Sequence, residues 1–144
     1  MRIVFDTTIL VRAGTRPRGL AGEALLAAIA GKHSKILSNE MLFELAKVLR
    51  YPRLMAVHRL PESRIYEFVE FLKETGEMVS LNPSFTAPIR DINDVIVLQT
   101  AVVGEADVIC TRDRDFFAPP ASEFLHALGI VVMDDIALMD RLRT

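Results

Sequence analysis

The feature of this sequence that most constrains its fold is an alternation of short apolar segments with longer helical ones. Five four-residue segments are mostly apolar and are bounded by polar or turn residues, which is typical of buried strands. These predicted strands are residues 2–5, 35–38, 78–81, 107–110 and 130–133. Strands this short and apolar have no solvated face. The alternation therefore indicates an α/β fold, a parallel sheet covered by helices on both sides.

The helical segments carry recognisable start and stop residues. Ser38 is a good N-cap, Pro61 a good first residue, and Gly31, Gly76 and Gly104 follow helical patterns. After Pro61, apolar residues recur at the helical spacing i, i+3, i+4, i+7. The predicted helices cover residues 20–30, 39–49, the stretch from Pro61 to Gly76, 95–103, 122–128 and 135–142.

Composition limits the class of protein. The 144 residues are 51% hydrophobic and contain no run of about 20 apolar residues, so we expect one domain over 1–144 with a buried core and no membrane span. The first residues read as a strand and not as a secretion signal, and the single Cys110 cannot form an internal disulfide. A cytoplasmic location is the expectation. The formal net charge of -2 argues against nucleic-acid binding by overall charge, although arginines are clustered locally.

Several carboxylates map to one edge of the predicted sheet. Asp6 ends the first strand, Asp113 follows the fourth, and Asp91 and Asp94 precede or open the helix that leads into the fourth strand. In open parallel sheets, ligands bind outside the carboxyl ends of the strands. Glu44, at the border of an apolar helical stripe, and Asp115 complete the set of acids.

The chemistry of such a cluster points to a hard metal ion. Packed carboxylates repel one another and stay ionised only if cations neutralise them. All-oxygen ligands suit Mg²⁺ or Mn²⁺, which can activate water for phosphate chemistry. Taken singly, Asp94 is equally well read as a helix cap, Asp113 as a turn residue and Glu44 as a solvated side chain.

Three blocks of the sequence resemble the PIN domain family of metal-dependent ribonucleases. They are IVFDTTILVRA at 3–13, SNEMLFELAKVLRYPRL at 38–54, and RDINDVIVLQTAVVGEADVICTRDRDF at 90–116. The order and spacing of the blocks are similar to those of the family over essentially the whole chain. The resemblance implies a five-stranded, mostly parallel sheet of order 3-2-1-4-5 between two helical layers.

The resemblance also implies roles for individual residues. Asp6, Glu44, Asp94 and Asp113 match the four-acid catalytic site, and Asp6, Asp94 and Asp113 would hold the metal. The supporting residues would be Thr8, Asp91, Thr111 and Asp115. Thr8 stands where the family usually has Asn, and Arg112 stands where it usually has Gly.

Two functions follow as expectations. The first is a Mg²⁺- or Mn²⁺-dependent endoribonuclease that cuts single-stranded RNA, as the toxin of a type II toxin–antitoxin pair, with an antitoxin partner and a homodimeric state. Four arginines would contact the RNA backbone, since arginine pairs bidentately with phosphate: Arg12, Arg16, Arg112 and Arg114. The second is a degenerate module on the same fold that binds RNA or a partner protein without cutting. The departures from the family pattern at Thr8 and Arg112 argue for this second function.

Other α/β functions fit less well. A dinucleotide-binding domain needs a glycine-rich turn after the first strand, and the DTTIL segment has none. The sequence has no P-loop, and Thr8 stands where an aspartyl phosphatase has its second Asp. The apolar segment 53–60 is read either as core or as part of a dimer or antitoxin surface.

Overall fold

The computed structural model describes all of residues 1–144 and contains one five-stranded sheet. Every strand pair is parallel, and the strand order is β3-β2-β1-β4-β5. This confirms the predicted α/β fold with strand order 3-2-1-4-5. The strands are β1 (Arg2–Phe5), β2 (Ser34–Ser38), β3 (Glu77–Val79), β4 (Val108–Cys110) and β5 (Val131–Met133).

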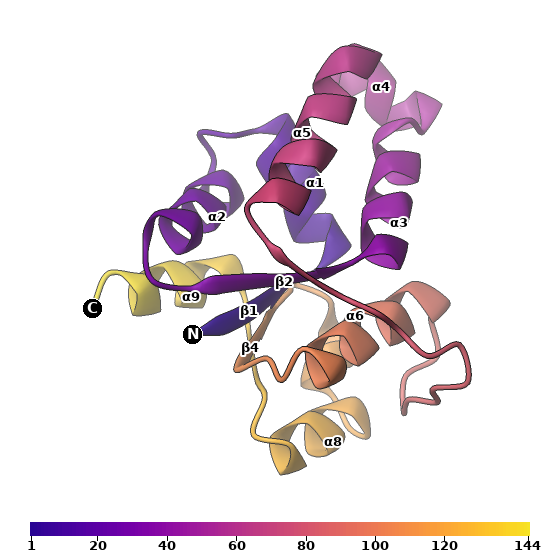
Figure 1. Ribbon diagram of the computed structural model, residues 1–144, viewed down its shortest axis with the longest axis vertical. Coiled ribbons are helices and arrows are strands. Elements are labelled where there is room, and N and C mark those ends of the chain that lie inside the picture. The colour runs from indigo at the N-terminus through magenta and orange to yellow at the C-terminus, as the bar shows by residue number, and fades with distance from the viewer.

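Helices cover both faces of the sheet. In the view of Figure 1, α1, α2 and the group α3–α5 lie above the strands, while α6 and α8 lie below them. No helix is both long enough and apolar enough to span a membrane. The helices are α1 (Thr7–Thr15), α2 (Leu20–Ala30), α3 (Asn39–Leu49), α4 (Pro52–His58), α5 (Glu62–Glu74), α6 (Ile92–Val103), α7 (Arg114–Phe117), α8 (Ala121–Ala127) and α9 (Asp135–Leu142).

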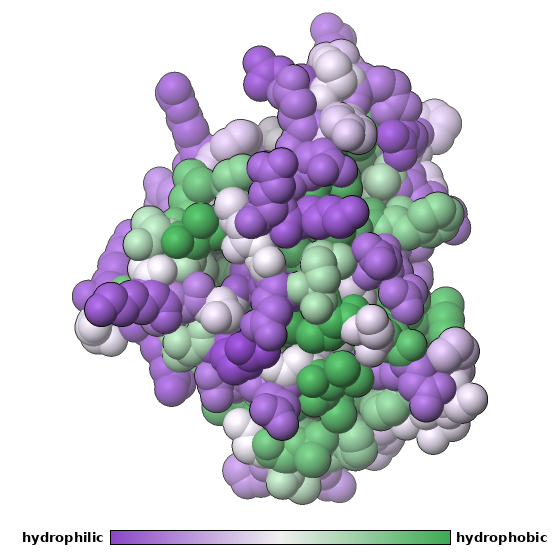
Figure 2. Space-filling model, viewed as in Figure 1, coloured by the Kyte–Doolittle hydropathy of each residue, from purple (hydrophilic) through white to green (hydrophobic).

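The core forms where the helices pack on the central strands. Residues 3–5 of β1 and 108–110 of β4 are almost fully buried, as expected for strands covered on both faces. Burying one large aliphatic side chain contributes about 1.5–3 kcal/mol, so this core fixes the central strands firmly. On the outside, Figure 2 shows mostly hydrophilic residues, with hydrophobic ones gathered over the lower part of the face, where α6 and α8 lie.

Local sequence signals explain where several helices begin and end. Ser38 caps α3 by accepting a hydrogen bond from the Met41 backbone N–H at 3.3 Å, as its position predicts. Gly31 and Gly104 stand directly after α2 and α6. These residues mark the start of α3 and the ends of α2 and α6.

Three helices were not predicted. The apolar residues Ile9 and Leu10 follow β1 after only three polar residues and no Gly or Pro, and they belong to α1, whose inner face packs on the core. Segment 53–60, predicted as a connector, is mostly α4, and the short α7 follows β4. The third strand is also shorter than predicted and begins one residue earlier, at Glu77.

The apolar residues of segment 53–60 divide between two environments. Met55 and Leu60 pack against the core, while Val57 is 75% exposed. Leu54 and Val57 line a cavity of about 260 Å³ together with Val11 of α1. The segment is therefore partly core and partly surface.

Candidate functional site

The candidate site lies at the topological switch point of the sheet. The strand order reverses between β1 and β4, and in open parallel sheets this is where a crevice forms at the carboxyl ends of the strands. Asp6 directly follows β1 and Thr111 directly follows β4. The Thr111 hydroxyl donates a hydrogen bond of 2.6 Å to Asp6 Oδ2, which joins the two strand ends.

Asp6 is a buried carboxylate held by hydroxyl groups. Asp6 is 5% exposed, and this burial raises the pKa of its carboxyl group. Hydrogen bonds from Thr111 and Thr8 lower that pKa and offset part of the rise. The Thr8 hydroxyl lies 3.1 Å from Asp6 Oδ2. Thr8, although shorter than the usual Asn, therefore still reaches the acid.

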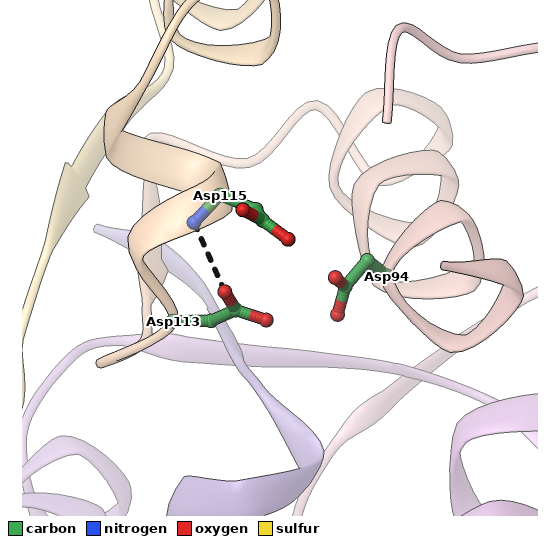
Figure 3. Close-up of side chains that lie close together, drawn as sticks. All are labelled: Asp94, Asp113 and Asp115. Atoms are coloured by element: carbon green, nitrogen blue, oxygen red, sulfur yellow. Dashed lines mark hydrogen bonds between the residues drawn. The ribbon is translucent and has the colours of Figure 1, made fainter. Parts of the chain in front are cut away.

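Three further acids converge next to Asp6. Asp94 from α6 faces Asp113 and Asp115 from the start of α7, as Figure 3 shows, and one carboxylate oxygen from each lies within 4.8 Å of the others. Asp113 is the N-cap of α7 and accepts a hydrogen bond of 3.0 Å from the Asp115 N–H. The Asp113 N–H in turn donates to Thr111 Oγ1 at 3.0 Å, so a single turn positions both acids.

The electrostatics of this cluster are unfavourable without a counter-charge. Burial, followed by repulsion from Asp113 and Asp6, raises the pKa of Asp94 to about 7. The chain forms three ion pairs, Arg2–Glu77, Arg50–Glu62 and Arg112–Asp135, and none of them includes an acid of the cluster. An oxygen-only donor set with no basic partner fits a hard divalent cation, which Asp94, Asp113 and Asp115 could hold beside Asp6.

Glu44 lies at the edge of the site and not in the close group. Its Oε1 accepts a hydrogen bond of 3.3 Å from the Asn93 side-chain amide, which connects α3 to the first turn of α6. Asp91 is exposed and caps α6 through the Asn93 N–H at 2.8 Å. Asn93 was not among the predicted residues. In the sequence, only its place between Asp91 and Asp94 indicated that it lies near the acids.

The four arginines predicted to contact RNA do not all lie in one place. Arg12, Arg16 and Arg112 line one cavity of about 440 Å³, whereas Arg114 is an exposed residue of α7 outside it. Arg112 avoids the left-handed backbone region and donates from Nε to Asp135 Oδ1 at 2.7 Å. Asp135, which is buried, also was not predicted. In the sequence, only its position shortly after β5, at the carboxyl edge of the sheet, indicated a place near the site.

Comparisons with known proteins agree with this architecture. A family model described as PIN domain matches residues 2–115. Among solved structures, the chain is similar to the crystal structure of VapBC2 from Rickettsia felis bound to a DNA fragment from their promoter. That match has a TM-score of 0.61 and 13% identity, covers 93% of this chain and 98% of the other, and shows the fold. A search of curated protein sequences finds no match.

The family model covers far more than half of the chain and includes all four acids of the candidate site, Asp6, Asp94, Asp113 and Asp115. The solved structure shares the fold over nearly the whole length. The chain therefore belongs to the PIN domain family.

Proposed function

We propose that this protein is a Mg²⁺- or Mn²⁺-dependent endoribonuclease that cuts single-stranded RNA in the cytoplasm. The observation that carries the proposal is the close group of Asp94, Asp113 and Asp115 beside buried Asp6, without a basic partner. PIN domains are generally nucleases, and this group provides the oxygen donors that such chemistry requires.

Each residue has a defined task in this proposal. Asp94 and Asp113, with Asp6, are the metal ligands, and Asp115 lies close enough to join them. Thr111 and Thr8 donate hydrogen bonds that orient the Asp6 carboxylate and favour its ionised form. Glu44, held by Asn93, orients the attacking water or contributes a further ligand. A bound divalent ion would neutralise the phosphate charge and activate the water.

We further propose that the protein is the toxin of a type II toxin–antitoxin pair, acts as a homodimer and binds an antitoxin protein. The support is the fold shared with VapBC2 from Rickettsia felis, whose crystal structure is of VapBC2 bound to a DNA fragment from their promoter. The partly exposed apolar surface of α4 beside α1, with Leu54, Val57 and Val11, is available for such contacts.

The alternative of a degenerate binding module was based on Thr8 and Arg112. Thr8 donates a hydrogen bond to Asp6, and Arg112 donates one to Asp135. Neither of these departures from the family's usual residues therefore disrupts the acid group. These contacts favour the nuclease over the binding module.

The test is cleavage of a mixed pool of labelled single-stranded RNAs by the purified protein. Reactions contain Mg²⁺, Mn²⁺ or EDTA, and an Asp94→Asn variant is purified identically. We expect cleavage that requires metal and is lost in the variant. A folded protein that cuts none of the RNAs with either metal would contradict the proposal and favour the binding module.

A further inference from the structure

The arginine cavity is separate from the acid group but lies at the same edge of the sheet. Arg12 reaches it from the second half of α1 and Arg16 from the position directly after that helix, and the first residues of α2 form part of its wall. Arg112 follows β4 and Asp135 follows β5, so both stand at carboxyl ends of strands. The cavity, of about 440 Å³, thus combines three segments that are distant in the sequence: residues 12–21, Arg112 and Asp135.

Its cationic groups have spare capacity for hydrogen bonding. The side chains of Arg12 and Arg16 make no hydrogen bond or ion pair within the chain, and Arg112 uses only Nε, with Asp135. The two terminal nitrogens of Arg112 are therefore free to donate. Gly19, the N-cap of α2, also has no side chain to cap the first turn, which adds a positive dipole end to the wall.

Asp135 explains why Arg112 points into this cavity. The Asp135 side chain is 1% exposed, while that of Arg112 is 40% exposed. A buried carboxylate that holds Nε fixes the guanidinium plane and leaves its outer edge to face a ligand. Arginine held in this way can form the paired hydrogen bonds that phosphate oxygens accept.

The chain links this cavity to the acid group. Arg112 stands between Thr111, which binds Asp6, and Asp113, a member of the group. Asp6 is the N-cap of α1, and Arg12 follows it by six residues, or roughly 9 Å along the helix axis. With a cation bound in the acid group, an RNA strand, which carries phosphates along its length, suits both places.

We propose that this cavity binds a phosphate of the RNA strand other than the one that is cut, with Asp135 as a positioning residue for Arg112. The proposal rests on the proposed function for its ligand. It assigns Arg12, Arg16 and Arg112 to a single phosphate site and leaves Arg114 out of it.

Binding is measured separately from cleavage, with the full-length protein in EDTA and a fluorescent single-stranded RNA of 12 nucleotides. Arg16→Gln and Arg112→Gln should each weaken binding about five- to tenfold and reduce the slope of log Kd against log salt concentration by about 0.7. Arg18→Gln, a neighbouring exposed arginine outside the cavity, is the matched control and should bind as the wild type does. Wild-type affinity in both cavity variants would overturn the proposal.

The role of Asp135 is tested by a double-mutant cycle. Asp135→Leu should weaken RNA binding about as much as Arg112→Gln and should add nothing when the two are combined. Asp135→Asn, which keeps an acceptor for Nε, should restore most of the affinity. Additive losses would overturn the positioning role, and circular dichroism of each variant shows whether the fold is intact.

Two further outcomes separate this proposal from the nuclease assignment. If the protein binds RNA through these arginines but never cuts it, the nuclease assignment fails and the phosphate site stands. If it cuts RNA and the arginine variants have an unchanged KM, the phosphate site fails. Displacement of the RNA by a polyglutamate peptide of equal length at equal concentration would assign the cavity to an acidic peptide and overturn the proposal.

Discussion

The carboxylate of Asp94 lowers the stability of the metal-free protein and has a proposed catalytic role. It is 8% exposed and is repelled by Asp113 and Asp6, so its ionised form destabilises the metal-free protein. Asp94→Asn should abolish cleavage and yet raise the free energy of unfolding in EDTA at pH 8 by about 1–2 kcal/mol, after allowance for solvent screening. The gain should shrink towards pH 4, where Asp94 is protonated. Thermal melts and RNA cleavage assays measure both effects.

Asp140, exposed on α9, supplies the control for this experiment. Asp140→Asn removes the same charge away from the site and should change neither stability nor cleavage appreciably. A loss of stability in Asp94→Asn would show that the Asp94 carboxylate stabilises the fold and is not a destabilising member of an acid group.

Lys35 is a second buried charge, at the opposite end of the sheet from the acids. It is 2% exposed, and its Nζ donates to Thr75 Oγ1 at 2.6 Å and lies 5.6 Å from the centre of the Phe71 ring. It has no carboxylate partner. Burial lowers its pKa to about 8, so the protonated form destabilises the folded state at neutral pH.

The pH dependence of stability follows from that lowered pKa. Between pH 8 and about 10.5 the unfolded chain binds more protons at Lys35 than the folded chain does, so its contribution to stability rises with pH over this window. Lys35→Met, of similar length, should stabilise the protein at pH 7 by about 1–2 kcal/mol and lose most of this advantage at pH 10. Urea unfolding at both pH values measures the difference. An equal gain at both would contradict the lowered pKa.

At the scale of elements, the sequence predicted those helices whose ends carry clear signals. Ser38, Gly31 and Gly104 stand at helix boundaries as expected. It did not predict α1, because the apolar run at residues 9–11 is too short for its periodicity to distinguish a helix from a strand. Only packing against the core makes that distinction. The hydrogen bond between Asn93 and Glu44 depends on the packing of α3 against α6. No pattern in the local sequence indicates that these two helices are neighbours.

One buried hydrogen bond couples the elements that carry Glu44 and Asp94. The hydroxyls of Ser38, the last residue of β2 and the N-cap of α3, and of Thr100, on α6, lie 2.9 Å apart. Ser38→Ala should lower the free energy of unfolding by about 1–2 kcal/mol through the lost cap and the lost bond. In a cycle with Thr100→Val, urea unfolding should give a coupling energy of about 0.5–1.5 kcal/mol. Exposed Ser80→Ala is the control, and strict additivity would show that the two hydroxyls do not interact.

At the scale of the whole molecule, the alternation of elements predicted a parallel sheet, but only the resemblance to the PIN domain family predicted its strand order. The order matters because it places β1 beside β4 and so brings Asp6 and Thr111 together across 105 positions of sequence. The convergence of Asp94 with Asp113 and Asp115 follows from the same arrangement. The sequence predicted that these acids lie at one edge of the sheet, whereas their spacing required the fold.

Metal binding should therefore be visible as stability of the whole fold. A divalent ion that binds the folded acid group and not the unfolded chain adds about 2.7 kcal/mol at a concentration of 100 times Kd. Mn²⁺ or Mg²⁺ should raise the Tm of the wild type at pH 8 but not that of Asp94→Asn, and the rise should be smaller at pH 6, where Asp94, whose pKa is about 7, is mostly protonated. Thermal melts with Ca²⁺-free buffers and stepwise metal additions measure the shift. A Tm that does not respond to metal in the wild type, or responds equally in the variant, would show that these acids do not form a metal site.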